Sequence, residues 1–281
     1  MANAKDRKSN FELLRIVAMM AIIGSHYFSH GAGFGPSVAS RILFHTCLLT
    51  SGNTGVAIFL LITGWFVRDA HFSLGKWLRL VGETWFYSWI GLLIALFVNR
   101  SKVDMLNVLT ALFPISSAQN WYAGNFIILY LFMPFITKTA VYLNSSIEEY
   151  NKLMAFSVFS FVLLGFVTPF NKVVSNFVWM LFCVLWGNYL RLFTEKRSIT
   201  VKQCLSFLLI IELVITFYSL TVDYLYNTYK LSFIDQMRDH LMGRFSVCTL
   251  TAASLIVILF SRLCFFQRQL ILLREPYLEY I

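Results

Sequence analysis

The chain has 281 residues, of which 58% are hydrophobic and only 13% charged, and its mean hydropathy is +0.68. A soluble domain with this balance would be hard to keep in solution, so the composition indicates a membrane protein with several spans. The net charge of +9 does not favour nucleic-acid binding, because Lys and Arg are spread over short loops rather than gathered in a soluble basic domain.

Apolar segments of the length that a bilayer requires, about 20 residues each, recur along the whole chain. We therefore predict an all-α polytopic transmembrane helix bundle of about eight spans, formed by residues 1–266 and followed by a polar tail, 267–281. The segment Val103–Ser117 is apolar but short and contains Pro114, so we interpret it as interfacial or re-entrant. The expected spans cover residues 11–29, 45–67, 78–98, 122–142, 153–170, 173–190, 205–226 and 245–265.

The positions of the basic residues predict the orientation of this bundle. With eight spans, about twice as many Lys and Arg residues fall on the side of the N-terminus as on the other, which favours cytoplasmic N- and C-termini. No small-residue cleavage site follows the first apolar run, so we expect a retained helix in a multi-pass protein of the cell membrane. The five cysteines lie in apolar spans without a CxxC pair and are interpreted as packing residues.

Two ionisable residues, Arg15 and His26, lie inside the first expected span. Each costs about 2.5–3.5 kcal/mol on insertion scales, so both are candidates for function. Eleven residues separate them, which places them on one helix face with about 16 Å of rise between them. They are too far apart to touch, but they suit two ends of one elongated ligand or two depths of a polar channel.

A purely structural explanation of these residues stays open. In this explanation, the Arg15 side chain extends to the membrane interface and pairs with Glu12, and His26 forms a hydrogen bond with a neighbouring backbone carbonyl. His30 follows His26 at a spacing that suits metal ligands, yet no third ligand or HExxH pattern accompanies it. We therefore expect no metal.

The second span and the loop after it form the next pattern. Small residues at positions 52, 55, 57, 63 and 64 allow another backbone to approach closely, as in ordinary helix packing. Lys76 and Arg79 follow, one helical turn apart. Such a pair binds phosphates or anchors a helix end at anionic lipid.

Three further acids lie at or near membrane depth. Glu83 and Glu212 fall inside expected spans, and Asp223 lies near an outer end. Acids in spans are candidates for function, and pairing with a neighbouring helix is the structural alternative.

Several runs of this sequence resemble, in order, motifs of the integral-membrane acyltransferase 3 family of glycan O-acyltransferases. The most specific are NFELLRIVAMMAIIGSH, with its Arg and His eleven positions apart, and GVAIFLLITGWF in the second span. FSLGKWLRL, NWYAGNFIILYLFMPFI and LFCVLWGNYLRLF continue the similarity, which covers about residues 9–193.

The resemblance implies an enzyme that moves an acyl group, usually acetyl from acetyl-CoA, to a sugar hydroxyl of a polysaccharide or its lipid-linked precursor. Carried over by position, Arg15 and His26 are the catalytic pair, and Lys76 and Arg79 are the basic motif that we expect to bind the donor. Membrane lipid and a glycan or lipid-linked sugar acceptor are the implied partners, without nucleic acid.

The sequence departs from the family pattern in three places. The basic motif with Lys76 and Arg79 is thinner than the common Arg-rich form of the family. Leu60, Leu61 and Thr63 stand where the family usually has Phe and Ser. Members usually have ten spans, so with eight this protein would be short at its C-terminus, which raises the alternative of an inactive truncated acyltransferase. A non-enzymatic transporter of polysaccharide or its precursor is the other alternative, which inverted repeats with paired broken helices would favour.

Overall fold

The computed structural model describes residues 9–27, 50–116, 121–163, 175–197, 199–231, 237 and 240–263. Within these ranges the only regular secondary structure is helical, as the apolar runs predict. From the N-terminus onward the helices are α1 (Ser9–Tyr27), α3 (Thr50–Trp65), the short η3 (Val67–Asp69), α4 (Leu74–Asn99), the short η4 (Arg100–Lys102), α5 (Met105–Leu112), α6 (Trp121–Leu131), α7 (Met133–Ser145), α8 (Ile147–Ser157), the π-helical η5 (Val158–Leu163), α10 (Asn176–Lys196), α11 (Val201–Tyr229) and α13 (Val247–Arg262).

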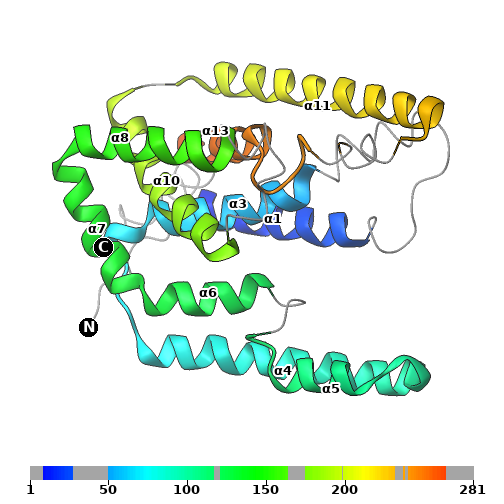
Figure 1. The fold of residues 1–281 in the computed structure, drawn as a ribbon. Helices are drawn as coiled ribbons and strands as arrows, with labels where there is room; N and C mark the ends of the chain where they lie inside the picture. The colour runs from blue at the N-terminus through cyan, green and yellow to red at the C-terminus, as the bar shows by residue number, and fades with distance from the viewer. Residues whose placement is uncertain are drawn as a thin grey trace, which may run out of the picture.

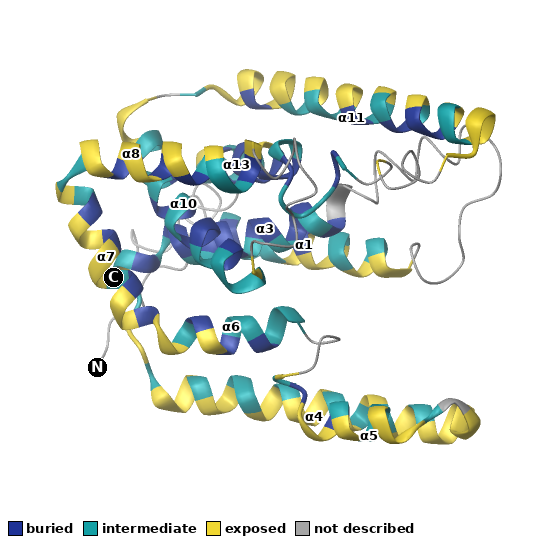
Figure 2. Cartoon of the chain, viewed as in Figure 1, coloured by how far each residue is buried: buried dark blue, intermediate teal, exposed yellow. Residues whose placement is uncertain are grey.

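Helix α3 lies at the centre of the bundle and contacts α1, α10 and α13 (Figure 1). On one side α11 packs along α13, and on the other α6 joins the centre to α4 and α5. Figure 2 shows buried residues gathered in the central helices, whereas α4 and α11 expose most of their surface. Exposed apolar residues on the outer helices are what lipid contact requires.

Small residues explain why α3 can take the central position. A Cβ on Gly64 would overlap the backbone of Val184 in α10, and one on Gly187 would overlap the backbone of Leu61. On the other face, a Cβ on Gly55 would come within 2.8 Å of the Ala18 carbonyl oxygen of α1. The packing role expected for the small residues of this span therefore holds at these glycines.

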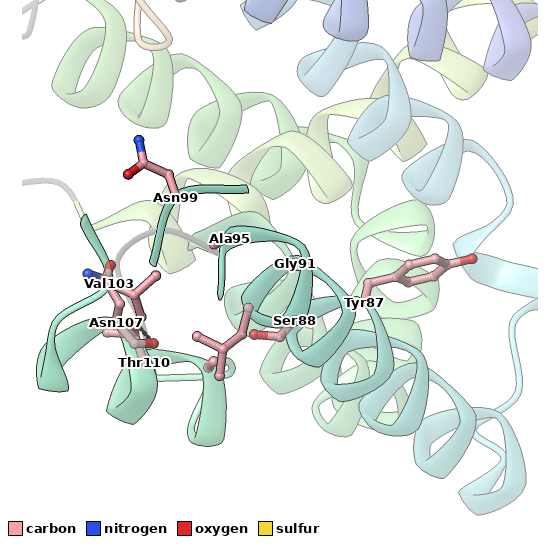
Figure 3. A pocket seen from close by; sticks show the side chains of 10 residues that line it. Tyr87, Ser88, Gly91, Ala95, Asn99, Val103, Asn107 and Thr110 are labelled. Atoms are coloured by element: carbon pink, nitrogen blue, oxygen red, sulfur yellow. Dashed lines mark hydrogen bonds between the residues drawn. The ribbon is translucent and has the colours of Figure 1, made fainter. Parts of the chain in front are cut away.

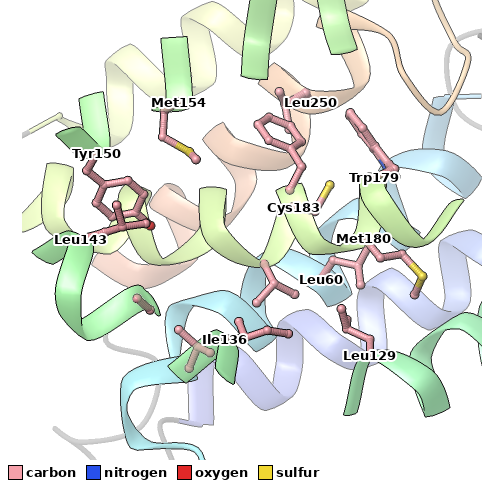
Figure 4. Close-up of a cluster of buried hydrophobic side chains, with 14 of the residues drawn as sticks. Leu60, Leu129, Ile136, Leu143, Tyr150, Met154, Trp179, Met180, Cys183 and Leu250 are labelled. Carbon is pink, nitrogen blue, oxygen red and sulfur yellow. The ribbon is translucent and has the colours of Figure 1, made fainter. Parts of the chain in front are cut away.

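The larger part of the core lies where α10 meets α3, α6, α7 and α8 (Figure 4). Trp179, Met180 and Cys183 of α10 are fully buried there. Asn188 is also fully buried, and its Nδ2 donates to the Tyr150 hydroxyl at 3.1 Å. The Tyr150 hydroxyl in turn donates to the Leu185 carbonyl at 2.5 Å, so these polar contacts join α8 to α10, although the Oδ1 of Asn188 has no hydrogen-bond partner in the described part of the protein.

The number of membrane spans is smaller by the structural criterion than the sequence predicts. In the described ranges, three helices are long and apolar enough to cross a bilayer, namely α4, α10 and α11, and the bent pair α6–α7 makes a fourth if it counts as one span. Each of the eight predicted segments contains a helix, but α3 and α13 are shorter than 18 residues. The prediction of eight spans with both termini in the cytoplasm is therefore not confirmed.

The predicted span 122–142 corresponds to two helices in the structure, α6 and α7, rather than to one continuous helix. The backbone bends by 69° between α6 and α7. Pro134 lies in the first turn of α7, where a backbone N–H has no acceptor within the helix. Because proline has no N–H, it cannot donate the hydrogen bond to a carbonyl of α6 that would continue one helix across this point. The predicted interfacial segment contains α5, which has eight residues and lies against α4.

Candidate functional site

Contacts along the helices fix which parts lie beside Arg15 and which beside His26. Helices α1 and α3 are antiparallel, since the Phe11 ring lies 5.4 Å from that of Trp65, whereas a Cβ on Gly52 would meet the Ser25 side chain at the opposite end. Helix α13 runs in the same direction as α3. The Nδ2 of Asn10 donates to the Phe260 carbonyl, and the Nδ2 of Asn53 donates to the Met242 carbonyl. The C-terminal halves of α3 and α13 therefore lie on the Arg15 side.

A cavity of about 600 Å³ lies on this Arg15 side, between α1, α3, α4 and α6. Its polar lining comes from Arg15, Thr63, Lys76, Arg79 and Glu83, and its apolar lining includes Phe66, which follows α3, and two aromatic residues of α6. The resemblance assigns Arg15 to the catalytic pair and Lys76 and Arg79 to the motif that is expected to bind the donor. The structure brings these three residues into one cavity wall, although they come from two helices that are far apart in sequence.

The position of α4 explains why its basic residues face this cavity. The indole Nε1 of Trp77 donates to the Ile127 carbonyl at 3.2 Å and joins α4 to α6. Lys76 and Arg79 lie one turn apart near the beginning of α4 and so project from one face. Because the N-terminus of a helix carries a partial positive charge, it reinforces the two cations, and an anionic ligand is favoured here.

Two acids reduce the positive charge of this cavity. Arg15 pairs with Glu12 at 2.5 Å, and Arg79 pairs with Glu83 at 2.7 Å. Lys76 forms no ion pair in the part of the protein that the structure describes. The Arg15–Glu12 pair is the structural alternative considered for Arg15, but the guanidinium lines the cavity as well, with 38% of the side chain exposed.

His26 does not line this cavity. It lies at the C-terminal end of α1, where its Nδ1 is 2.8 Å from the carbonyl oxygen of Ile22 and the imidazole is exposed. A carbonyl oxygen only accepts hydrogen bonds, so Nδ1 carries the proton, and in the neutral ring Nε2 holds the lone pair. His30, its possible companion as a ligand, lies outside the described residues.

Of the three further acids, Glu83 lies at the cavity, whereas Glu212 and Asp223 lie on α11. Glu83 pairs with Arg79 but also lines the cavity. Glu212 lies on α11 away from the cavity, and its Oε2 is buried without a hydrogen bond in the described part of the molecule. Asp223 is buried, 7% exposed, near the C-terminal end of α11.

A second cavity, of about 370 Å³, lies between α4 and α5 (Figure 3). Tyr87, Ser88, Asn99, Asn107 and Thr110 supply its polar groups. None of the sequence-predicted site residues lines it. It carries no charged group among its lining residues, so it does not suit the phosphates of a coenzyme.

The sequence did not reveal that Arg191 and Arg244 make contacts that join separate helices. Arg191 donates to the Trp65 carbonyl at 3.0 Å and lies 3.4 Å from Asp69, so it joins α10 to the end of α3. Arg244 lies over the ring of Trp121, with the guanidinium carbon 3.4 Å from the ring centroid. In the sequence Arg191 belongs to the family-like run LFCVLWGNYLRLF and Arg244 is only a basic residue that reports topology, and no local pattern reveals the partners of either.

The apolar helices and the cavity lined by three basic residues define a helical membrane protein with a cation-lined cavity. The acyltransferase domain of the acyltransferase 3 family matches residues 8–275, almost the whole sequence. The protein therefore belongs to the acyltransferase 3 family, and the resemblance seen in its motifs is confirmed. Comparisons with curated proteins and with solved structures found no match. The predicted boundary between residues 266 and 267 lies outside the described residues.

Proposed function

We propose that this protein is a multi-pass enzyme of the cell membrane that transfers an acyl group, acetyl from acetyl-CoA, to a sugar hydroxyl of a surface polysaccharide or its lipid-linked precursor. The observation that supports the proposal most is that Arg15, Lys76 and Arg79 share one cavity near the N-terminal end of α1, whereas His26 lies at the C-terminal end of that helix. Family membership supplies the acyltransferase class, and the cavity supplies a place for an anionic donor.

The donor half of the reaction uses the cations. The phosphates of coenzyme A meet Lys76 and Arg79 at the beginning of α4, and the planar guanidinium of Arg15 makes paired contacts to the donor. The rise of about 16 Å between Arg15 and His26 is then covered by the extended pantetheine arm, which leads the thioester towards the imidazole.

The acceptor half of the reaction uses His26. Its Nε2 takes the proton of the sugar hydroxyl while the hydroxyl oxygen attacks the thioester carbonyl carbon. The tetrahedral intermediate collapses with cleavage of the carbon–sulfur bond, and the imidazolium returns the proton to the leaving thiolate. The products are the sugar ester and free coenzyme A, so atoms and charge balance without a metal.

The test compares surface glycans of cells that carry the parent protein, no protein, or His26→Ala, by mass and by base-labile ester content. We expect the rate of ester transfer to fall by about 10²–10⁴-fold in His26→Ala, the range that a general base contributes, so ester content should approach that of cells without the protein. His71→Ala is the matched control, because His71 is an exposed histidine before α4 and not part of the proposed machinery.

Two outcomes would refute the proposal. Equal ester content in the parent and in His26→Ala removes His26 from the chemistry. Loss of the glycan itself from the surface, with its esters unchanged per sugar, indicates a transporter instead.

A further inference from the structure

The loop before α13 holds one arginine in an unusual environment. Arg244 lies between the ring of Trp121, 3.4 Å from the guanidinium carbon, and Asn176, whose Oδ1 accepts a hydrogen bond from its Nη1. Its Nε is buried and has no hydrogen-bond partner in the described part of the molecule. Three separate segments, the beginnings of α6 and α10 and the loop before α13, therefore meet around one guanidinium.

This cation lacks the acid that the other partly buried arginines have. Arg15 pairs with Glu12, Arg68 with Glu195, and Arg191 with Asp69. No carboxylate pairs with Arg244 in the described ranges, and the ring of Trp121 offers only its quadrupole. Burial lowers the pKa of Arg244 to about 10, which still leaves it protonated at pH 7. A partly buried charge of this kind favours an anionic partner.

The backbone that carries Arg244 is firmly held. The Ser246 hydroxyl donates to the Leu241 carbonyl at 2.5 Å, and the Thr249 hydroxyl donates to the Gly243 carbonyl at 3.0 Å. Asn53 of α3 holds the Met242 carbonyl at 2.9 Å. A guanidinium on such a loop is positioned before any ligand arrives, so binding costs little ordering.

The surrounding helix ends add positive potential. Asn176 is the first residue of α10, and Ser246 caps the first turn of α13 two residues after Arg244. Both helices present their N-terminal ends to this region, where unpaired N–H groups and the helix dipole favour anions.

The position of this cluster separates it from the donor cavity. Phe126 and Tyr130 of α6 line that cavity, and Trp121 comes a turn or more earlier on the same helix, away from the Arg15 side. Met242, bonded to Asn53 in the first half of α3, also lies on the His26 side. Arg244 therefore lies towards the His26 end of the bundle and not beside the donor cavity.

We infer that Arg244, held by Trp121 and Asn176, is a binding residue for an anionic group of the acceptor, a phosphate or a carboxylate. A lipid-linked sugar diphosphate and an acidic glycan both offer this chemistry. The inference rests on the proposed function where it identifies the anionic ligand as the acyl acceptor, whereas anion binding itself can be measured without any acyl transfer.

The experiment measures binding of defined probes to the purified full-length protein in an uncharged detergent that contains no phosphate. The probes are farnesyl diphosphate for the lipid-linked source, trigalacturonate for the acidic glycan, and maltotriose as the neutral comparison. We expect at least one anionic probe to bind the parent, more weakly at high salt, and maltotriose not to show this salt dependence. The probe that binds identifies the source.

Variants assign the binding to Arg244. Arg244→Gln should weaken binding of the anionic probe at least tenfold. Arg262→Gln should change it less than twofold, because Arg262 lies at the opposite end of α13 and, in the described part of the protein, donates hydrogen bonds to the Thr194 and Arg197 carbonyls. If Arg244→Gln does not fold, Arg244→Lys keeps the charge and should bind about three- to tenfold more weakly, since lysine lacks the planar fork.

Three results would overturn the inference. They are a parent that binds neither anionic probe, an Arg244→Gln or folded Arg244→Lys variant that binds as the parent does, and equal losses in the Arg244 and Arg262 variants. Binding of acetyl-CoA to the parent, measured in the same preparation, tests the proposed donor separately. A parent that binds the anionic probe but not acetyl-CoA keeps the anion site and refutes the donor assignment.

Discussion

At the scale of single residues, Arg15 shows how one side chain serves both structure and ligand binding. Its Nη1 pairs with Glu12 at 2.5 Å, while the guanidinium also lines the cavity that contains Lys76 and Arg79. A guanidinium has five N–H donors in a fixed plane, so an ion pair with one acid leaves other donors available for a ligand. An ion pair seen in the structure is thus compatible with a role towards a donor substrate.

Arg15→Lys tests whether the planar group is used. We expect kcat/KM for acetyl-CoA to fall by roughly tenfold or more, because lysine keeps the charge but cannot make paired contacts. The measurement is release of free coenzyme A by the purified variant. Full activity with lysine would reduce Arg15 to a point charge or a structural anchor.

Lys76→Gln tests the cation of the cavity that forms no ion pair among the described residues. We expect KM for acetyl-CoA to rise roughly fivefold with kcat little changed, since a phosphate contact made equally in ground and transition states affects binding only. The effect should shrink at high salt. Lys152→Gln is the control, because Lys152 is an exposed lysine of α8 that pairs with Glu148. A similar rise in both variants would contradict a phosphate site at Lys76.

At the scale of helices, glycine positions decide how closely α3 and α10 approach. The crossing leaves no room for a methyl group at Gly64, because the Val184 backbone occupies that position. On α4, by contrast, a Cβ on Gly82 would find nothing within 4 Å. The same substitution therefore has opposite consequences on two helices of one bundle.

Gly64→Ala should lower the free energy of unfolding by about 1–3 kcal/mol, the usual cost of overpacking. Gly82→Ala should be neutral or stabilise by up to about 1 kcal/mol, because alanine has the higher helix propensity. Thermal or denaturant unfolding of the two purified variants gives the comparison. A loss at Gly64 no larger than at Gly82 would show that the crossing relaxes without cost.

At the scale of the whole molecule, the two ends of α4 provide positions at which the orientation of the donor cavity can be tested. Its 26 residues rise about 39 Å, enough to cross a hydrocarbon core of about 30 Å. Ser73 precedes the helix beside the cavity, and Ser101 follows its far end. The excess of basic residues predicts that Ser73 faces the cytoplasm.

Cysteines placed singly at Ser73 and Ser101, in a protein without its five native cysteines, should label oppositely. We expect Ser101→Cys to react with an impermeant thiol reagent in intact cells, and Ser73→Cys to react only after the cells are opened. The reverse pattern would refute a cytoplasmic donor cavity, and labelling of both would exclude α4 as a span.

The sequence by itself determined the helical class, the membrane environment and the family, because hydropathy and short motifs are local properties of the polypeptide. It also singled out Arg15, Lys76 and Arg79, since a charge in or beside an apolar span is visible without any tertiary contact. The roles of these residues and of His26 stay predictions.

Only the tertiary structure decided which residues meet. The cavity shared by Arg15 and Lys76, the bend between α6 and α7, and the position of Arg244 over Trp121 depend on contacts between segments far apart in the sequence. The physical reason is that side-chain packing and helix crossing are set by complementary surfaces of several helices at once, which no local pattern encodes.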